Sequence, residues 1–300
     1  MKVQDRLLAI LIVIIWGVNF TVIKFGVDGI PPLLLVALRF AFAAFPALLF
    51  IRRPQAPLRH IVAYGLTVGV GQFACLFCAI HIGMPAGAAS VILQAQAFFT
   101  IFLAALFFHE RIHGRQIVGL TMAAAGLAFI SGQFDSQAAV IPLDSLVLTL
   151  GGALCWGLSN IVVRQASTAA AEEGKHLDVL SLVVWSSLVP PLPMLALSAW
   201  LEGPDAMASA ILHIQPVTVF SICYLSFLAT IVGYGLWSKL LAKYEAHKIA
   251  PLSLLVPVFG LLTARFVLGE SLSLWQWLGV IVVILGLVVT NMPIHRPKGA

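Results

Sequence analysis

The sequence predicts an all-α integral membrane protein with ten transmembrane helices, arranged as two inverted five-helix repeats with both termini in the cytoplasm. Three observations indicate this fold class: the composition, the placement of positive charge and an internal repeat. Of 300 residues, 61% are hydrophobic and 10% are charged, with a mean hydropathy of +1.03. Soluble domains carry about 25% charged residues. A chain this apolar cannot cover its surface with polar groups in water, so we expect a bilayer around it.

Ten apolar stretches are long enough to cross a membrane, which takes about 20 residues of helix. They cover residues 7–27, 31–51, 61–82, 86–108, 116–132, 143–164, 179–201, 217–241, 249–268 and 275–292. No small-residue cleavage site follows the first stretch, and nine further stretches come after it. We therefore expect the first stretch to be a mature helix and not a signal peptide.

Positive charge is confined to one side of this ten-helix topology. Of the 17 Lys and Arg residues, all but Lys24, Arg39 and Arg265 lie in the tails or in loops on one face, and the predicted loops of the opposite face contain none. Because Lys and Arg mark cytoplasmic loops, both termini are predicted to be cytoplasmic. This bias also explains the net charge of +5, so nucleic-acid binding is not indicated.

An internal repeat divides the chain into residues 1–140 and 141–300. The first apolar segments of the two halves share Trp16-Gly17 and Trp156-Gly157, 140 residues apart, and a second set recurs at an offset of 160: Glu110, Gly119 and Gly126 against Glu270, Gly279 and Gly286. Because five spans per half is an odd number, the second half crosses the membrane in the opposite direction. Inverted repeats are typical of secondary transporters, which bind substrate between the halves near mid-membrane.

The same residues resemble the EamA family of drug/metabolite transporters. The resemblance is carried by residues 16–20 (WGVNF) with Lys24, residues 38–40 (LRF) and the two Glu/Gly sets. Residues 83–87, 93–100, 229–235 and 251–257 are similar to the bacterial exporters of cysteine and O-acetylserine within that family. The resemblance implies a multi-pass inner-membrane amino-acid exporter with a central cavity lined by both halves. Arg265 departs from the family pattern, because this run is otherwise apolar.

Polar groups inside apolar spans are candidate substrate ligands, since hydrocarbon does not solvate them. Asn19 and Asn160 occupy nearly equivalent places in the two halves and can present amides to a cavity between them, or bond neighbouring helices. Gln94 and Gln96 are two positions apart, about 200° around a helix, so they cannot both face one cavity. We expect one to bind substrate and the other to bridge helices.

Arg39 is the deepest unambiguous cation, eight residues into the second span. It could bind a substrate carboxylate bidentately, cap carbonyls at a helix end or extend to the outer surface. Lys24 and Arg164 lie near opposite membrane faces and are expected to be interfacial anchors. Trp16, Trp156 and Tyr234 could stack around a substrate, or contribute aromatic packing alone.

Nothing in the sequence indicates an enzyme, a metal or a cofactor. Residues 109–113 fit the HExxH pattern of zinc hydrolases, but they fall in a short connection and not on a continuous helix. The expected function is alternating-access export of cysteine, O-acetylserine and related amino acids. Export of aromatic amino acids or drugs, and proton-coupled antiport, are the alternatives.

Overall fold

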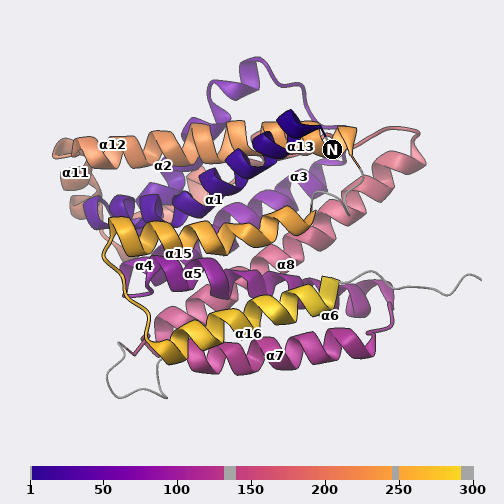
Figure 1. The fold of residues 1–300 in the computed structure, drawn as a ribbon. Coiled ribbons are helices and arrows are strands. Elements are labelled where there is room, and N and C mark those ends of the chain that lie inside the picture. The colour runs from indigo at the N-terminus through magenta and orange to yellow at the C-terminus, as the bar shows by residue number, and fades with distance from the viewer. Residues whose placement is uncertain (1, 132–139, 245–249, 292–300) are drawn as a thin grey trace, which may run out of the picture.

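The computed structural model describes residues 2–131, 140–244 and 250–291, and the regular structure in these ranges is entirely helical (Figure 1). The first half comprises α1 (Val3–Gly29), α2 (Pro32–Ala44), the 3₁₀ turn η1 (Ala47–Leu49), α3 (Leu58–Tyr64), the π-helix η2 (Gly65–Gln72), α4 (Phe73–His81), α5 (Ala86–Ile92), the 3₁₀ turn η3 (Leu93–Ala95), α6 (Gln96–Phe108) and α7 (Gly114–Ile130). The predicted carboxyl-terminal tail lies outside the described residues.

The second half begins with the longest helix. Its elements are α8 (Leu143–Glu172), α9 (Val179–Ser186), α10 (Pro191–Leu201), α11 (Pro204–Leu212), α12 (Pro216–Cys223), the π-helix η4 (Tyr224–Val232), α13 (Gly233–Lys243), the 3₁₀ turn η5 (Ala250–Leu255), α15 (Val256–Val267) and α16 (Leu274–Asn291). Two predicted boundaries need correction. The sixth span continues eight residues past Arg164 to Glu172, and the predicted loop after residue 201 contains helix α11.

Six continuous helical runs in the described residues are long and apolar enough to cross a membrane: Val3–Gly29, Pro32–Leu49, Leu58–His81, Ala86–Phe108, Leu143–Glu172 and Pro216–Lys243. The pair α9 and α10, bent by 41°, makes a seventh if it counts as one span. Three shorter apolar helices, Gly114–Ile130, Leu252–Val267 and Leu274–Thr290, occupy the places predicted for the fifth, ninth and tenth spans. The chain is therefore a multi-pass helical membrane protein.

Proline determines where several of these helices begin and bend. Pro32, Pro191, Pro204 and Pro216 stand in the first turns of their helices, where the missing N–H would have no partner in any case. Pro190 and Pro191 also separate α9 from α10, because proline removes a backbone donor and its ring clashes with the preceding turn. The bend lies beside the pocket described below.

Glycines bring helices of the two halves into close contact. A Cβ at Gly17 on α1 would lie 2.5 Å from the Cβ of Phe259 on α15, and one at Gly157 on α8 would lie 2.9 Å from that of Phe99 on α6. Phe99 and Phe259 are themselves 160 residues apart. The contact of α1 with α15 is therefore equivalent in position to the contact of α8 with α6. Only glycine allows this approach of the backbones.

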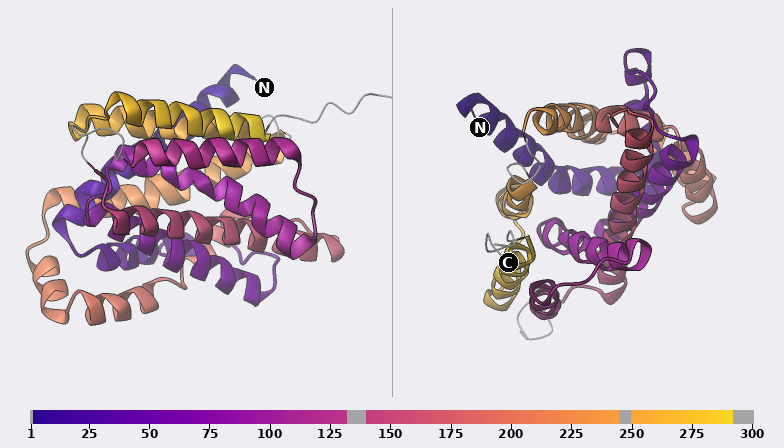
Figure 2. Two further views of the ribbon diagram at one scale, coloured as in Figure 1. Left: turned by 90° about the horizontal axis from the view of Figure 1, so that it is seen from below. Right: turned by 90° about the vertical axis from the view of Figure 1, so that its right-hand side faces the viewer.

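Helices α7 and α16 lie side by side along one edge of the bundle (Figures 1 and 2). A Cβ at Gly126 would lie 2.7 Å from the carbonyl oxygen of Gly279, and one at Gly119 would lie 2.6 Å from that of Gly286. These are the four glycines that the sequence repeat pairs by offset. The two helices thus cross through matched small residues.

Candidate functional site

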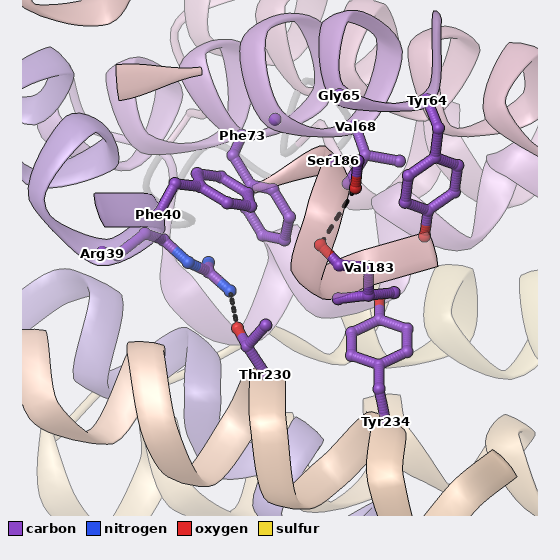
Figure 3. Close-up of a pocket in the computed structure, with 11 residues that line it drawn as sticks. Arg39, Phe40, Tyr64, Gly65, Val68, Phe73, Val183, Ser186, Thr230 and Tyr234 are labelled. Carbon is purple, nitrogen blue, oxygen red and sulfur yellow. Dashed lines mark hydrogen bonds between the residues drawn. The ribbon is translucent and has the colours of Figure 1, made fainter. Parts of the chain in front are cut away.

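A pocket between the two halves contains Arg39, a buried cation (Figure 3). The first half contributes residues from α2, α3, η2 and α4, and the second half residues from α9, η4 and α13. The lining consists of Arg39, Phe40, Tyr64, Gly65, Val68, Gly69, Phe73, Val183, Ser186, Thr230 and Tyr234. In this conformation the free space is about what one water molecule requires. Accommodating a metabolite would therefore require the helices to separate.

Arg39 is 3% exposed and points into this pocket (Figure 3). Its Nη2 donates to Thr230 Oγ1 at 3.0 Å, while Nε and Nη1 have no hydrogen-bond partner in the described part of the chain. The guanidinium carbon lies 4.0 Å from the ring centroid of Phe73 and 5.1 Å from that of Phe40. In this conformation the guanidinium is therefore buried and donates to no backbone carbonyl of the described residues.

Two π-helical segments flank the pocket. Segment η2 supplies Gly65, Val68 and Gly69, and η4 supplies Thr230. The two segments occupy equivalent places, since residues 65–72 shifted by 160 coincide with 225–232. Thr230 Oγ1 also donates to the carbonyl oxygen of Leu225, five residues earlier, as the wider π turn permits. Such segments occur frequently at functional sites.

Aromatic side chains continue from the pocket towards α1. The phenol groups of Tyr64 and Tyr234 point towards each other across it (Figure 3). The ring of Tyr234 lies 5.3 Å from that of Trp16, whose Nε1 donates to the carbonyl oxygen of Ala229 at 3.0 Å. Trp16 also contacts the ring of Trp237 at 5.2 Å. Of the predicted site residues, Arg39, Tyr234 and Trp16 are thus brought together.

Asn160 and Gln96 belong to a different cluster, between α6 and α8. Asn160 Nδ2 donates to Gln96 Oε1 at 2.8 Å and to Thr100 Oγ1 at 3.0 Å. In this state both amides bond neighbouring helices, the second of the two roles considered for Asn160. Gln96 therefore fits the bridging member of the glutamine pair.

The side chains of the remaining predicted residues, Asn19, Gln94 and Trp156, form no hydrogen bond with either cluster in the described part of the chain. Asn19 and Gln94 are each 8% exposed. Asn19 Oδ1 is buried, and no group in the described residues donates a hydrogen bond to it. Trp156 is partly buried and packs against the main apolar core. An unpaired buried carbonyl is costly, so Asn19 stays a candidate ligand.

Arg164 forms an ion pair with the opposite half of the chain, whereas Lys24 forms one within α1. Arg164 Nη2 lies 2.6 Å from Glu110 Oε1, and Lys24 Nζ lies 2.6 Å from Asp28 Oδ1. Lys24 lies five residues before the end of α1, and Arg164 lies eight residues before the end of α8. The hydrogen bond from Arg164 lowers the pKa of Glu110 below its ordinary value.

Two carboxylates accept hydrogen bonds from the first turns of helices in the opposite half. Glu270 accepts from the backbone N–H groups of Ala86 at 2.7 Å and Gly87 at 2.9 Å, at the start of α5. Glu202 accepts from the N–H of Leu33, at the start of α2, at 2.8 Å. These groups have no partner within their own helix, so a carboxylate there stabilises the helix end.

Sequence reasoning missed several pocket residues: Phe40, Tyr64, Phe73, Ser186 and Thr230. Phenylalanine in an apolar span carries no positional signal, because it is equally expected to face lipid. Thr230 and Tyr64 did offer one, since they place polar atoms within spans. Their relation to Arg39 depends on packing between α2, η2 and η4, which the sequence alone does not specify.

Comparison with known proteins identifies the family. The EamA-like transporter family matches residues 6–132 and again residues 144–292. The chain belongs to the EamA-like transporter family. Within the EamA-like family it is 46% identical over 290 residues to a probable amino-acid metabolite efflux pump of Salmonella typhimurium, covering 96% of this chain and 95% of that protein. A protein of the same description from Escherichia coli is 45% identical with the same coverage.

More distant similarities support the same fold. This EamA-like chain is 26% identical over 273 residues to a probable terminal-alkyne amino-acid exporter of Streptantibioticus cattleyicolor, covering 87% of this chain and 84% of that protein. A solved crystal structure matches with a TM-score of 0.63 at 15% identity, covering 100% of both chains. At that identity the match concerns the fold alone. The two family matches, which together cover nearly the whole chain, identify this protein as an EamA-like transporter.

Proposed function

We propose that this protein exports cysteine, O-acetylserine and related amino acids across the bacterial inner membrane by alternating access. The observation that carries the proposal is Arg39, a buried cation with unpartnered N–H donors in a pocket lined by both halves. An amino acid always brings a carboxylate to pair with it. The similarity to two probable amino-acid metabolite efflux pumps supports the same class of cargo.

The architecture proposed for this activity is ten spans in two inverted repeats, residues 1–140 and 141–300, with both termini cytoplasmic. The matched glycine contacts of α7 with α16, and of α1 and α8 with their fourth-span partners, support it. So does the recurrence of π-helical segments at η2 and η4. An inverted repeat permits two states that open to opposite sides of a fixed site.

The proposed substrate site combines Arg39, Trp16 and Tyr234 with the amides of Asn19 and Gln94. Gln96, Trp156 and Asn160 are assigned to the facing wall, reached when the halves rearrange. The present hydrogen bonds of Asn160 to Gln96 and Thr100, between α8 and α6, would have to exchange for bonds to the cargo. Lys24 and Arg164 are assigned to anchoring.

Uptake into everted membrane vesicles tests the function, because export appears there as accumulation. Vesicles containing the protein should accumulate radiolabelled cysteine under reducing conditions faster than vesicles carrying Arg39→Gln. Preferential accumulation of phenylalanine or of a cationic drug would favour the alternative cargoes. Accumulation that strictly requires an imposed pH gradient would favour proton-coupled antiport.

A reporter that functions only in the cytoplasm tests the topology. It should be active at both termini and between α6 and α7, and inactive between α4 and α5. Activity of the reporter between α4 and α5 would contradict the ten-span arrangement.

A further inference from the structure

We infer that the Arg39 pocket selects its cargo through the carboxylate, and that the substrate's amino group contributes little to recognition. This inference rests on the proposed export function and defines its substrate class. The class comprises small carboxylic acids, with a free or an acylated amino group. It excludes amines, esters and amides of the same side-chain size that lack the carboxylate.

The first evidence is the unused hydrogen-bonding capacity of Arg39. A guanidinium carries five N–H donors, and the described residues take up one of them, through Thr230. A cation in apolar surroundings is costly without a counter-charge. A carboxylate is the complementary group, because its two oxygens accept from Nη1 and from the remaining N–H of Nη2 in one plane.

The second evidence is the placement of the aromatic rings. The Arg39 guanidinium carbon lies 4.0 Å from the Phe73 ring centroid, with Phe40 at 5.1 Å and Phe77 at 5.7 Å. These rings stabilise the guanidinium through cation–π attraction and restrict its orientation. Since Arg39 occupies this aromatic cluster, those rings are not available to a substrate ammonium group.

The third evidence is the absence of an acidic side chain from the pocket lining. In the described ranges, five carboxylates have partners outside the pocket. Asp28, Glu110 and Asp5 pair with basic residues, and Glu202 and Glu270 accept from helix N–H groups. A substrate ammonium in the pocket therefore meets only neutral acceptors such as the hydroxyls of Tyr64, Tyr234 and Ser186.

The net charge of the occupied site then ranks the ligands. With Arg39 positive, an N-acyl amino acid brings the site to neutrality, and a zwitterionic amino acid leaves one positive charge. An amine or amino ester leaves two positive charges at close range in a poorly screened environment, which is strongly unfavourable. N-acylation should therefore be tolerated wherever the acyl group fits, and loss of the carboxylate should not.

Four redox-inert analogues test this ranking: S-methyl-L-cysteine, its N-acetyl derivative, its methyl ester and 2-(methylthio)ethylamine. Binding is measured by the thermal shift of the purified full-length protein, and competition by inhibition of S-methyl-L-cysteine uptake into everted vesicles. The two acids should raise the melting temperature and compete. The ester and the amine should bind more weakly, on the order of tenfold to a hundredfold, the range for losing a charge-assisted hydrogen bond.

Two variants connect the ranking to the pocket. Arg39→Gln should abolish the preference for acids, whereas Arg59→Gln, which alters an exposed arginine at the start of α3, should preserve it. The inference is overturned if the amine binds as well as the acid, if neither acid binds, or if Arg39→Gln keeps the wild-type ranking. Acids that bind through Arg39 but never enter the vesicles would instead refute the export function and leave the carboxylate site intact.

Discussion

Arg164 and Glu110 form an ion pair with Nη2 and Oε1 2.6 Å apart, whereas their repeat-equivalent residues, Lys24 and Glu270, do not pair with each other. Glu270 is instead bound to the first N–H groups of α5. The two equivalent positions thus differ in their contacts. An alternating-access protein with inverted repeats is expected to show such a difference, since its two faces are in opposite states at any moment.

This difference predicts that Lys24 and Glu270 come into contact in the opposite state of the proposed transport cycle. When the halves exchange conformations, Glu270 should release α5 and approach Lys24, as Glu110 approaches Arg164 here. In a background without the four native cysteines, the pair Lys24→Cys and Glu270→Cys should form a disulfide that blocks transport until it is reduced. Lys24→Cys with Glu202→Cys serves as the control. Equal cross-linking of the two pairs would contradict the exchange.

The Glu110–Arg164 pair should make a small, pH-dependent contribution to folding stability. The pKa of Glu110 is lowered from its ordinary value of 4.5, so the contribution is present above that value and is lost as the pH falls through the lowered pKa. The melting temperature of Glu110→Gln should therefore fall slightly below wild type at neutral pH and converge with it in acid. The difference is small because both side chains are half exposed. A difference that grows on acidification would contradict this assignment.

Helices α7 and α16 should tolerate no side chain at their crossing. A Cβ at Gly126 would lie 2.7 Å from both the Gly279 carbonyl oxygen and Val283 Cγ2, so Gly126→Ala should destabilise the protein by about 1–3 kcal/mol through overpacking. Gly114→Ala is the matched control, because nothing lies within 4 Å of a Cβ there. Thermal melting in detergent measures both. Equal melting temperatures would show that the crossing is looser than described.

Substitution of some of the candidate amide residues should reduce transport, and substitution of others should reduce stability. Asn19→Ala and Gln94→Ala should reduce transport with near-normal expression, since neither side chain has a hydrogen-bond partner among the described residues. Asn160→Ala should lower stability by about 1–3 kcal/mol, because it leaves Gln96 Oε1 without its Asn160 donor. The double variant Gln96→Met with Asn160→Leu should recover much of that loss, because no partly buried amide of this pair is then left without its partner. Full transport by both Asn19→Ala and Gln94→Ala would show that they lie outside the substrate path.

The features of this protein that depend on a single segment of the sequence could be predicted. The contacts between helices that are distant in the sequence could not. The apolar runs, the position of Arg39 within one of them and the different directions of the Gln94 and Gln96 side chains follow from length, hydropathy and helical periodicity. The π-helical segments did not follow, because Gly65–Gln72 and Tyr224–Val232 show no distinguishing periodicity. The aromatic surroundings of Arg39 also did not follow. Phe73 contacts the guanidinium only after α2 packs on α4, and no local pattern distinguishes it from the other phenylalanines.

The contact of α1 with α15 has a consequence for biosynthesis. Thr21 on α1 donates a hydrogen bond to Thr263 at 3.1 Å, a residue 242 positions later in the chain. At a synthesis rate of about 5–20 residues per second, the partner emerges roughly 10–50 s after the first helix. During that interval the polar face of α1 has neither its glycine-mediated contact nor its hydroxyl partner. We therefore expect this helix to need shielding by the insertion machinery until α15 has been synthesised.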